Sequence, residues 1–344
     1  MEKIQISRIK EDIEELPKLD LKDKKILALL VNDCRLTFSE IAKKVMLSRD
    51  AVRYRINRMQ EVGIIQKFTI ITEHRRFDFR QFRIYMQISE HEKEKELKFF
   101  EYLKNNKNIL NVIEYSDKWE LEVVVYAKDL QEFDEILNDM LTQNPDVIEN
   151  TEIIDVVKNY TFVQLPRNFI KVKLNEPMEQ ITAKKTVDKE KIKIDDTDKK
   201  LLNLLAKNGR ESLYSLAEEL KVSADTINYR IKKLIEKGII QQFTTIINWS
   251  LIGYHFYELF LTMKYLTKED EMKLKEIVKN HPHIVRAMKT MGHFNVLIHV
   301  VAQKQKEFHN TIRQMRQEFK ELLKKYDTLI SYRELKFEVF SSLI

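Results

Sequence analysis

Apolar residues near the start of the chain recur at helical spacing. Ile26, Leu29 and Leu30 fall on one face of a helix, because positions three and four apart are neighbours on a helix surface. Asp20 and Asp23 precede this stripe and can cap the start of the helix. The pattern therefore predicts a first helix that begins just after Asp20.

Two further short helices follow, and each has a recognisable start. Thr37 and Glu40 have the spacing of a capping box before the apolar stripe of a short second helix. Ser48 is a good N-cap for a third helix, and Gly63 supplies a left-handed stop after it. The β-branched run 64–72 beyond this stop predicts a wing strand. The expected inward positions of the two helices are Ile41, Ala42, Val45, Val52, Ile56 and Met59.

Beyond residue 80 the pattern changes to segments with alternating apolar and polar positions, which are typical of half-buried strands. The segments follow the order strand, helix, strand, strand, helix, strand, at 82–89, 92–105, 110–116, 120–127, 129–141 and 147–162. The second half of the chain repeats this order at 257–264, 269–280, 284–290, 294–302, 306–325 and 329–340. Both series predict a ferredoxin-like, split βαβ fold.

A single shift of 175 residues superimposes the two halves of the chain without a gap. Residues 19–72 and 194–247 share 22 identities in 54 positions, and Gly63-Ile64-Ile65-Gln66 falls on Gly238-Ile239-Ile240-Gln241. Self-similarity on this scale predicts a duplicated architecture. The run 166–193 has no steady apolar period and is typical of a linker.

These patterns predict an α+β chain with two winged helix-turn-helix domains and two ferredoxin-like (βαββαβ) domains in tandem repeat. We expect an N-terminal extension (1–18), a winged helix-turn-helix domain (19–75), a ferredoxin-like domain (76–165), a linker (166–193), a second winged domain (194–250) and a second ferredoxin-like domain (251–344). The two copies would pack against one another as an intramolecular pseudo-dimer. A linker of this length equally allows two chains to exchange partners, so a homo-oligomer stays open.

Composition excludes some classes of protein. No stretch approaches the roughly 18 uninterrupted apolar residues that a membrane helix needs, and the first residues lack the apolar segment of a signal peptide. Cys34 is the only cysteine, which favours a reducing, cytoplasmic location. The net charge of +6 is modest, but residues 20–67 hold 11 Lys/Arg against 6 Asp/Glu, whereas residues 195–242 hold 9 against 8. The first helical domain is therefore the more basic.

The outward side of the third helix carries residue types that hydrogen-bond phosphates and base edges when a helix enters the major groove. Basic residues on an amphipathic helix are also typical of a solvated surface. Here, however, two short helices, a tight turn, a Ser-capped third helix and a strand occur twice in the same order. This context favours binding of double-stranded DNA. The candidate DNA-binding residues are Ser48, Arg49, Arg53, Tyr54, Asn57 and Arg58 in the first copy and Ser223, Asn228, Tyr229, Lys232 and Lys233 in the second.

At these residues the chain resembles the Lrp/AsnC, or feast/famine, family of transcription regulators. The resemblance rests on Leu19-Asp20 with Asp23, on Ile41-Ala42 leading to Leu47-Ser48, on Arg55-Ile56 with Gly63-Ile64-Ile65, and on their counterparts in the second copy. It implies a DNA-binding regulator whose sheet domain dimerises and binds a small effector such as an amino acid. The chain departs from the family where Met46 and Lys221 replace a turn glycine. A non-glycine residue at positive φ costs on the order of 1 kcal/mol, so the turn would be strained or reshaped.

Effectors of the family bind near a glycine-containing hairpin that is followed by an acidic residue. The second copy keeps Gly292 but has Asn295 in place of the acid, whereas the first copy keeps Asp117 but lacks the glycine. These three are the candidate effector-binding residues. The alternative is that Gly292 only makes a tight turn and Asn295 only begins a strand.

The sequence offers little for catalysis. Its five glycines are too scattered to form a phosphate-binding loop, and it lacks cysteine pairs and a His-Glu-x-x-His motif, so we expect no catalytic residue, metal or cofactor. The enzymatic alternative is a site like that of sirohaem decarboxylases, whose two-domain scaffold is similar and whose His and Arg side chains handle tetrapyrrole carboxylates. Its candidates are His281, His283, Arg286, His293 and His299, and the equivalent positions of the first copy hold Asn106, Asn108, Asn111, Lys118 and Val124. Such a site would be one-sided.

A third alternative is a protein-interaction scaffold whose winged domains have lost DNA binding. The second copy supports it, since Ala224 and Asn228 stand where the first copy has Arg49 and Arg53. We therefore predict that Arg49→Ala or Arg53→Ala weakens DNA binding more than Asn228→Ala does.

Overall fold

The computed structural model describes residues 6–10, 13, 15–89, 93–170 and 194–340. The chain divides into two units, and each unit draws on both copies of the repeat. One, the barrel unit, falls within Met1–Leu16, Phe79–Phe169 and Trp249–Phe337; the other, the helix-turn-helix unit, falls within Pro17–Asp78, Ile170–Asn248 and Glu338–Ile344. Residues 171–193 of the expected linker, parts of the expected N-terminal extension and the expected helix start at Glu92 lie outside the described residues.

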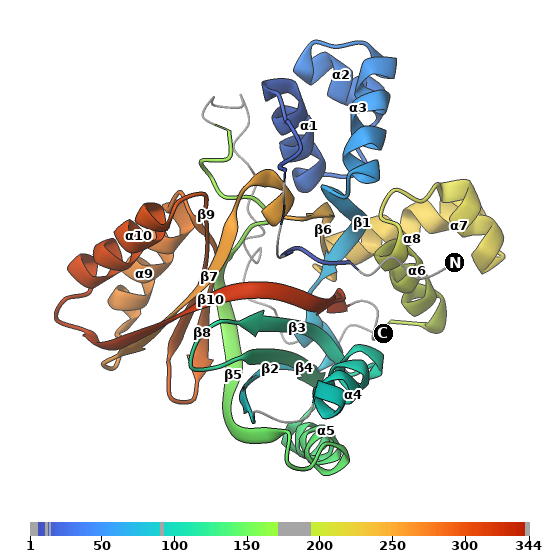
Figure 1. Ribbon diagram of the computed structural model, residues 1–344. Helices are drawn as coiled ribbons and strands as arrows, with labels where there is room; N and C mark the ends of the chain where they lie inside the picture. Colours follow the sequence, from blue (N-terminus) through green and yellow to red (C-terminus); the bar gives the residue numbers. More distant parts are fainter. Residues whose placement is uncertain (1–5, 11–12, 14, 90–92, 171–193, 341–344) are drawn as a thin grey trace. The chain divides into compact units, whose positions relative to one another are not determined.

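The helix-turn-helix unit contains the two predicted sets of three helices (Figure 1). They are α1 (Leu21–Asn32), α2 (Phe38–Val45) and α3 (Arg49–Glu61) in the first copy and α6 (Asp196–Lys207), α7 (Leu213–Leu220) and α8 (Ala224–Glu236) in the second. The predicted caps are confirmed: the side chain of Asp20 accepts from the Asp23 backbone, Thr37 and Glu40 form a capping box, and Ser48 caps α3. Gly63, after α3, has a φ of 79°, which is the predicted left-handed stop.

The two strands that follow the helices pair with each other. Strand β1 (Ile65–Thr72) and strand β6 (Ile240–Ile247) form a two-stranded antiparallel sheet in which Thr69 lies opposite Thr244. Thr244 Oγ1 donates to the carbonyl of Val31 in α1 over 2.6 Å, and Thr69 Oγ1 donates to that of Ala206 in α6 over 2.8 Å. Each wing strand therefore contacts the helices of the other copy, and the two helix-turn-helix domains are tied together.

The barrel unit has the predicted element order in both copies. The first copy supplies β2 (Arg80–Ile88), α4 (Lys93–Asn105), β3 (Ile109–Tyr115), β4 (Leu121–Ala127), α5 (Leu130–Gln143) and β5 (Ile148–Phe162). The second supplies β7 (His255–Met263), α9 (Lys268–Asn280), β8 (Ile284–Met291), β9 (Val296–Ala302), α10 (Gln305–Glu318) and β10 (Leu323–Phe337). Short 3-10 helices, η1 (His74–Phe77) and η2 (Ser250–Ile252), precede β2 and β7.

Eight strands close into one antiparallel barrel with the order β10-β3-β4-β2-β5-β8-β9-β7. Each copy contributes four neighbouring strands, and the copies meet at two seams, β5 with β8 and β10 with β3. At the seams, Asp155 lies opposite Met291, and Glu334 lies opposite Ile113. Closure pairs the edge strands of one copy with those of the other, so none of these eight described strands keeps a free edge.

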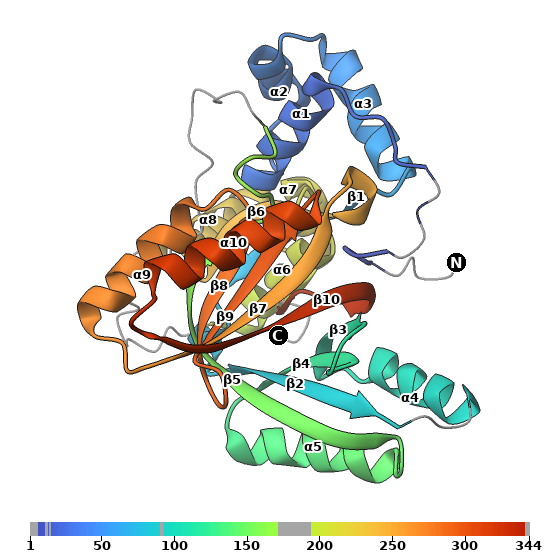
Figure 2. The same ribbon diagram turned by 60° about the vertical axis from the view of Figure 1, so that its left-hand side comes forward.

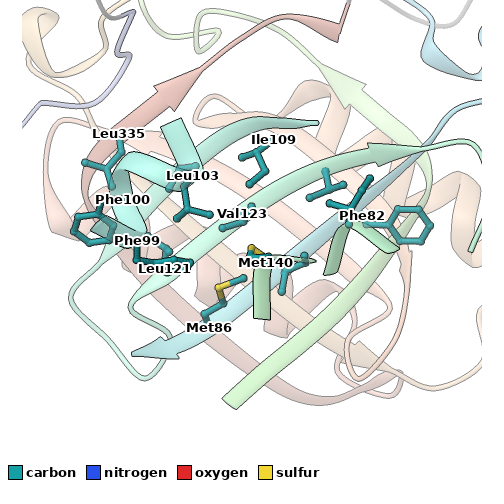
Figure 3. Packing of buried hydrophobic residues seen from close by; sticks show 14 of the residues in the cluster. Phe82, Met86, Phe99, Phe100, Leu103, Ile109, Leu121, Val123, Met140 and Leu335 are labelled. Carbon is teal, nitrogen blue, oxygen red and sulfur yellow. The ribbon is translucent and has the colours of Figure 1, made fainter. Parts of the chain in front are cut away.

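Strand alternation gives each sheet two buried faces. On β2, Phe82, Ile84 and Met86 pack in the core under α4 and α5, which Figure 3 shows together with Leu335 from β10. Figure 2 shows α9 and α10 against β8 and β9, where an equivalent core contains Leu259. The opposite face of β2 carries Gln81, Arg83 and Tyr85, which are also buried. The inside of the barrel is thus lined partly by polar side chains.

One predicted boundary is wrong. The helix expected over 306–325 ends at Glu318, and β10 begins at Leu323, six residues before the expected start. Lys320, Glu321 and Lys324 have a helix-like charge pattern, but Leu323 pairs with Met263 of β7, so strand pairing overrides local propensity.

The first residues of the expected linker pack on the barrel unit. The indole N–H of Trp249 donates to the carbonyl of Gln164 over 2.9 Å, and the ring of Phe169 lies 6.3 Å from that of Tyr254. In the part of the chain that the structure describes, no helix combines the length and the apolar character needed to cross a membrane.

Candidate nucleic-acid interface

Helix α3 separates a buried side from a polar, exposed side. Val52, Ile56 and Met59 are buried against the other helices of the domain. Arg49, Arg53 and Asn57, each four residues apart, form an exposed stripe on the other side. The ring of Tyr54 beside this stripe is 68% exposed. The structure therefore places these predicted residues together on one accessible surface, with Ser48 at the head of the helix.

Helix α8 repeats this arrangement with less charge. Ile227, Ile231 and Leu234 are buried, and Ser223 caps the helix. Asn228 is half-buried, whereas Tyr229, Lys232 and Lys233 are exposed. The ammonium group of Lys233 lies 5.9 Å from the centre of the Tyr229 ring, within range of a cation–π contact. The stripe equivalent to that of α3 is Ala224, Asn228 and Lys232.

An arginine on each of these helices ties it to the first helix of its domain. Arg55 donates to Asp20 and to Asp23, at 2.7 Å each. In the second copy Arg230 donates to Asp195 and Asp198 at the same distances. The bond from Arg230 lowers the pKa of Asp195. These contacts, which we call the arginine braces, fix the orientation of α3 and α8.

Sequence reasoning missed the braces, although the signal was present. Asp20, Asp23 and Arg55 are all identical to their counterparts at the offset of 175 residues. Arg58, a predicted DNA-binding residue, also donates to Asp23 over 2.7 Å. The charge of Arg58 is therefore partly satisfied within the domain, unlike the exposed stripe.

The turn before each of these helices adopts the strained conformation that the sequence predicted. Met46 and Lys221 both have a φ of 54° in the left-handed region. The Met46 side chain is 77% exposed and therefore contributes little packing. The turn keeps the geometry that a glycine would give, at the steric cost of a side chain.

The candidate effector residues lie on hairpins of the barrel unit, and two of them make structural contacts. Gly292 has a φ of 139°, and a Cβ there would lie 2.9 Å from the carbonyl oxygen of Ile153. Asn295 accepts from the Met263 backbone N–H over 2.9 Å and donates to its carbonyl over 2.8 Å. Asp117 is exposed on the hairpin of the other copy. The side chain of Asn295 thus completes the end of β7.

The histidines proposed for a tetrapyrrole site are spread along the barrel unit. His281 and His283 lie before β8, whereas His293 lies beyond its far end, so roughly eight residues of extended strand separate them, about 26 Å. Burial lowers the pKa of His281 to about 4. The other two candidates point into the barrel, where His299 lies 3.0 Å from Glu258 and Arg286 donates to Asn159 over 2.9 Å. The five side chains therefore form no single cluster. Among the described residues, no group of three or more His, Cys, Asp and Glu side chains could hold a metal ion.

Comparison with known proteins identifies both helical regions. Residues 19–60 match the AsnC-type helix-turn-helix domain, and residues 194–241 match a winged helix-turn-helix DNA-binding domain. The HTH-type transcriptional regulator FL11 of Pyrococcus furiosus is 31% identical over 117 residues, which cover 34% of this chain and 76% of that protein. Another regulator of Pyrococcus furiosus, described as an uncharacterized HTH-type transcriptional regulator, is 28% identical over 151 residues, which are 42% of this chain and 97% of that protein.

The whole chain also has a similar solved structure. The crystal structure of the siroheme decarboxylase NirDL matches with a TM-score of 0.61, covering 93% of this chain and 94% of that chain. The two sequences are 13% identical. This likeness shows that the tandem α+β fold exists in another protein, and it carries no information about the reaction.

Proposed function

This chain belongs to the Lrp/AsnC family of transcriptional regulators, in a tandem-duplicated form, and from that premise we propose that it binds specific DNA sequences as an intramolecular pseudo-dimer. The single observation that carries the proposal is the exposed stripe of α3. Arg49, Arg53 and Asn57 repeat every four residues on the outward side of a capped, braced helix. A helix with this face fits the major groove, where arginine recognises guanine and phosphate and asparagine recognises adenine.

The two copies would contribute unequally to DNA binding. The α3 stripe carries two guanidinium groups and an amide, whereas the α8 stripe carries a methyl group, an amide and one ammonium group. Arginine can bind a base edge through two parallel hydrogen bonds, but lysine acts as a single point charge. In our proposal α3 reads bases, and α8 mainly adds phosphate contacts through Lys232 and Lys233.

Two sets of pairings support a pseudo-dimer formed within one chain. Strands β1 and β6 join the helix-turn-helix domains, and the seams β5–β8 and β10–β3 join the ferredoxin-like domains. Each of these pairings is between one copy and the other, which is the arrangement expected where two subunits of a dimer have been fused. Control by a small molecule has less support, because the amide of Asn295 is already bonded to the Met263 backbone.

Selection from a pool of random duplex DNA at low and at moderate salt tests the proposal. We expect a motif with two half-sites spaced by about one helical turn or a multiple of it, one half-site being better defined than the other. Retention should fall steeply as the salt concentration rises, since lysine and arginine contacts to phosphate release counterions.

Other outcomes would redirect the assignment. One half-site alone would assign recognition to one copy and a supporting role to the other. No retention even at low salt would refute DNA binding and favour the protein-interaction scaffold. A change in the absorption spectrum of an added iron tetrapyrrole, or its consumption, would then distinguish the enzymatic alternative.

A further inference from the structure

Charged side chains from both copies meet inside the barrel. Arg83 on β2 contacts Glu122 on β4 of its own copy, and its Nη1 lies 3.3 Å from Glu258 Oε1 on β7 of the other copy. The hydroxyl of Tyr85 donates to Glu258 over 2.8 Å. His299 also approaches Glu258, with Nε2 3.0 Å from the same Oε1 atom.

The residues that face each other across the copies occupy equivalent positions. The offset of 175 residues places Arg83 on Glu258 and Tyr85 on Phe260. Arg83 contacts Glu258, and the rings of Tyr85 and Phe260 meet edge to face at 5.1 Å between centroids. Equivalent positions meet where a pseudo-two-fold axis passes between two copies. If the copies were identical, each of these residues would contact its own duplicate.

Burial makes the charge at this position decisive. Arg83 is 1% exposed and Glu258 is fully buried. A buried charge is strongly destabilising unless an opposite charge and hydrogen bonds compensate it. Pairing two first copies would put guanidinium against guanidinium, and pairing two second copies would put carboxylate against carboxylate. The Arg83–Glu122 contact lies within the first copy and would survive either rearrangement, so it does not discriminate between partners.

We infer that the buried Arg83–Glu258 contact makes pairing of the ferredoxin-like sheets heterotypic: a first copy accepts a second copy as its partner and rejects another first copy. The partner surface is therefore a sheet of this fold that carries a carboxylate where the first copy carries Arg83. This inference rests on the proposed pseudo-dimer, and it adds the contact that selects the partner.

Two charge-symmetric chains provide the test. Glu258→Arg leaves arginine at both positions of one chain, and Arg83→Glu leaves glutamate at both. Neither chain can join these two positions by an opposite-charge contact of its own. When the two are unfolded and refolded together, the first copy of the Glu258→Arg chain can pair with the second copy of the Arg83→Glu chain, and the remaining two copies can pair likewise. The opposite charges are then restored between chains.

Single cysteines report this exchange. Asp155 and Met291 lie opposite each other at the β5–β8 seam, within reach of a disulfide. Asp155→Cys is placed in the Glu258→Arg chain and Met291→Cys in the Arg83→Glu chain, so only pairing between chains can close the bond. Cys34 is buried, and burial raises the pKa of its thiol to about 12, so oxidation after refolding leaves it unreactive.

We expect at least roughly tenfold more interchain disulfide from this mixture than from the same two cysteines in chains that keep Arg83 and Glu258. The double variant Arg83→Glu with Glu258→Arg, carrying both cysteines, should close the bond within one chain, as the unswapped chain does. Equal interchain yields from the two mixtures would overturn the inference. So would a swapped chain that fails to close, because complementarity would then not be sufficient.

A different result marks failure of the pseudo-dimer itself. If the chain that keeps Arg83 and Glu258 and carries both cysteines does not close its disulfide, the seam is absent, and the proposed pairing fails together with its selectivity. As a matched control, Arg333→Glu disturbs another pair between copies, with Glu114, at a more exposed position of the β10–β3 seam. It should leave the interchain yield at the level of the unswapped chains, since exposed pairs contribute little.

Discussion

The two helix-turn-helix domains are alike in their interior and differ on their outward surface. Each has an arginine brace, Arg55 or Arg230, that binds two aspartates at the first helix. Each also has a non-glycine residue in the left-handed turn. On the surface, the stripe Arg49, Arg53 and Asn57 of one copy is replaced by Ala224, Asn228 and Lys232 in the other. Positions shared by the copies hold the domain together, and positions that differ distinguish what each copy contacts.

The same rule applies where the copies touch each other. Arg83 and Glu258 are equivalent positions with opposite charge, and they are in contact. Cys34 and Gly209 are also equivalent, and both lie against Thr69 of β1. Near a pseudo-two-fold axis identical residues would compete for one space, so duplication followed by divergence can improve a contact that a homodimer could not make.

The largest effect should follow substitution of Gly209. A Cβ at this position would lie 2.7 Å from the carbonyl oxygen of Thr69 and 2.9 Å from its backbone nitrogen. Because these are backbone atoms of a paired strand, Gly209→Ala should lower the free energy of unfolding by about 2–3 kcal/mol. Urea unfolding of the full chain measures this, and Cys34→Ala, which removes only one sulfur atom, is the matched variant. Equal losses for the two variants would show that the copies are interchangeable here.

The next effect concerns DNA binding. Arg53→Ala should weaken binding to the selected DNA by about tenfold or more, whereas the equivalent Asn228→Ala should weaken it less. The physical reason is that Arg53 is exposed and charged on α3, while Asn228 is half-buried on α8. Titration of a labelled duplex at fixed salt gives both dissociation constants.

A control arginine separates recognition from general charge. Arg313 is exposed on α10 of the barrel unit, and Arg313→Ala removes the same charge. We expect it to leave binding within about twofold, since a phosphate contact by a residue outside the helix-turn-helix unit is not part of the proposal. Similar losses for Arg53→Ala and Asn228→Ala would break the inequality between the copies.

Local signals in the sequence predicted the helical part of the fold well. Thr37 with Glu40, and Ser48, mark helix starts through hydrogen bonds made within three residues, so the chain needs no distant partner to reveal them. Strand pairing has no such local signal. Nothing near Thr69 in the sequence indicates that it lies opposite Thr244, and nothing near Asp155 indicates Met291. The closed barrel therefore could not be predicted from the pattern of alternation.

The candidate site was predictable to a similar extent. The exposure of Arg49, Arg53 and Asn57 follows from helical periodicity alone. The involvement of Arg58 with Asp23 depends on how α3 crosses α1, which periodicity does not give. The repeat offered more than was used, because the offset that aligns Arg83 with Glu258 already reveals a reversal of charge. Only the structure shows that these two positions touch.

Relief of turn strain should have a smaller and favourable effect. Met46→Gly and Lys221→Gly remove a side chain from a residue with a φ of 54°, and each should raise the free energy of unfolding by up to about 1 kcal/mol. Because the strain is the same in both copies, the two gains should be similar and additive in urea unfolding. A loss of stability at either position would mean that the side chain makes a contact that outweighs the strain.

The smallest effect should come from the exposed end of the second arginine brace. The hydrogen bond from Arg230 lowers the pKa of Asp195, so the charged carboxylate stabilises the folded state above the ordinary pKa range of an aspartate. This contribution is lost as pH falls through the lowered pKa. The Asp195 side chain is 55% exposed, so screening by solvent should limit the loss in the Asp195→Asn variant to below about 0.5 kcal/mol at neutral pH.

Asparagine also caps helices, so Asp195→Asn keeps a capping side chain and changes mainly the charge. Urea unfolding of the unsubstituted chain and of this variant, at neutral and at acid pH, gives the difference in stability between them at each pH. We expect that difference to shrink as the solution becomes acidic, because the carboxylate of the unsubstituted chain then becomes protonated and loses its attraction to Arg230. A difference that stays constant with pH would assign the effect to the cap and leave the brace without an electrostatic role.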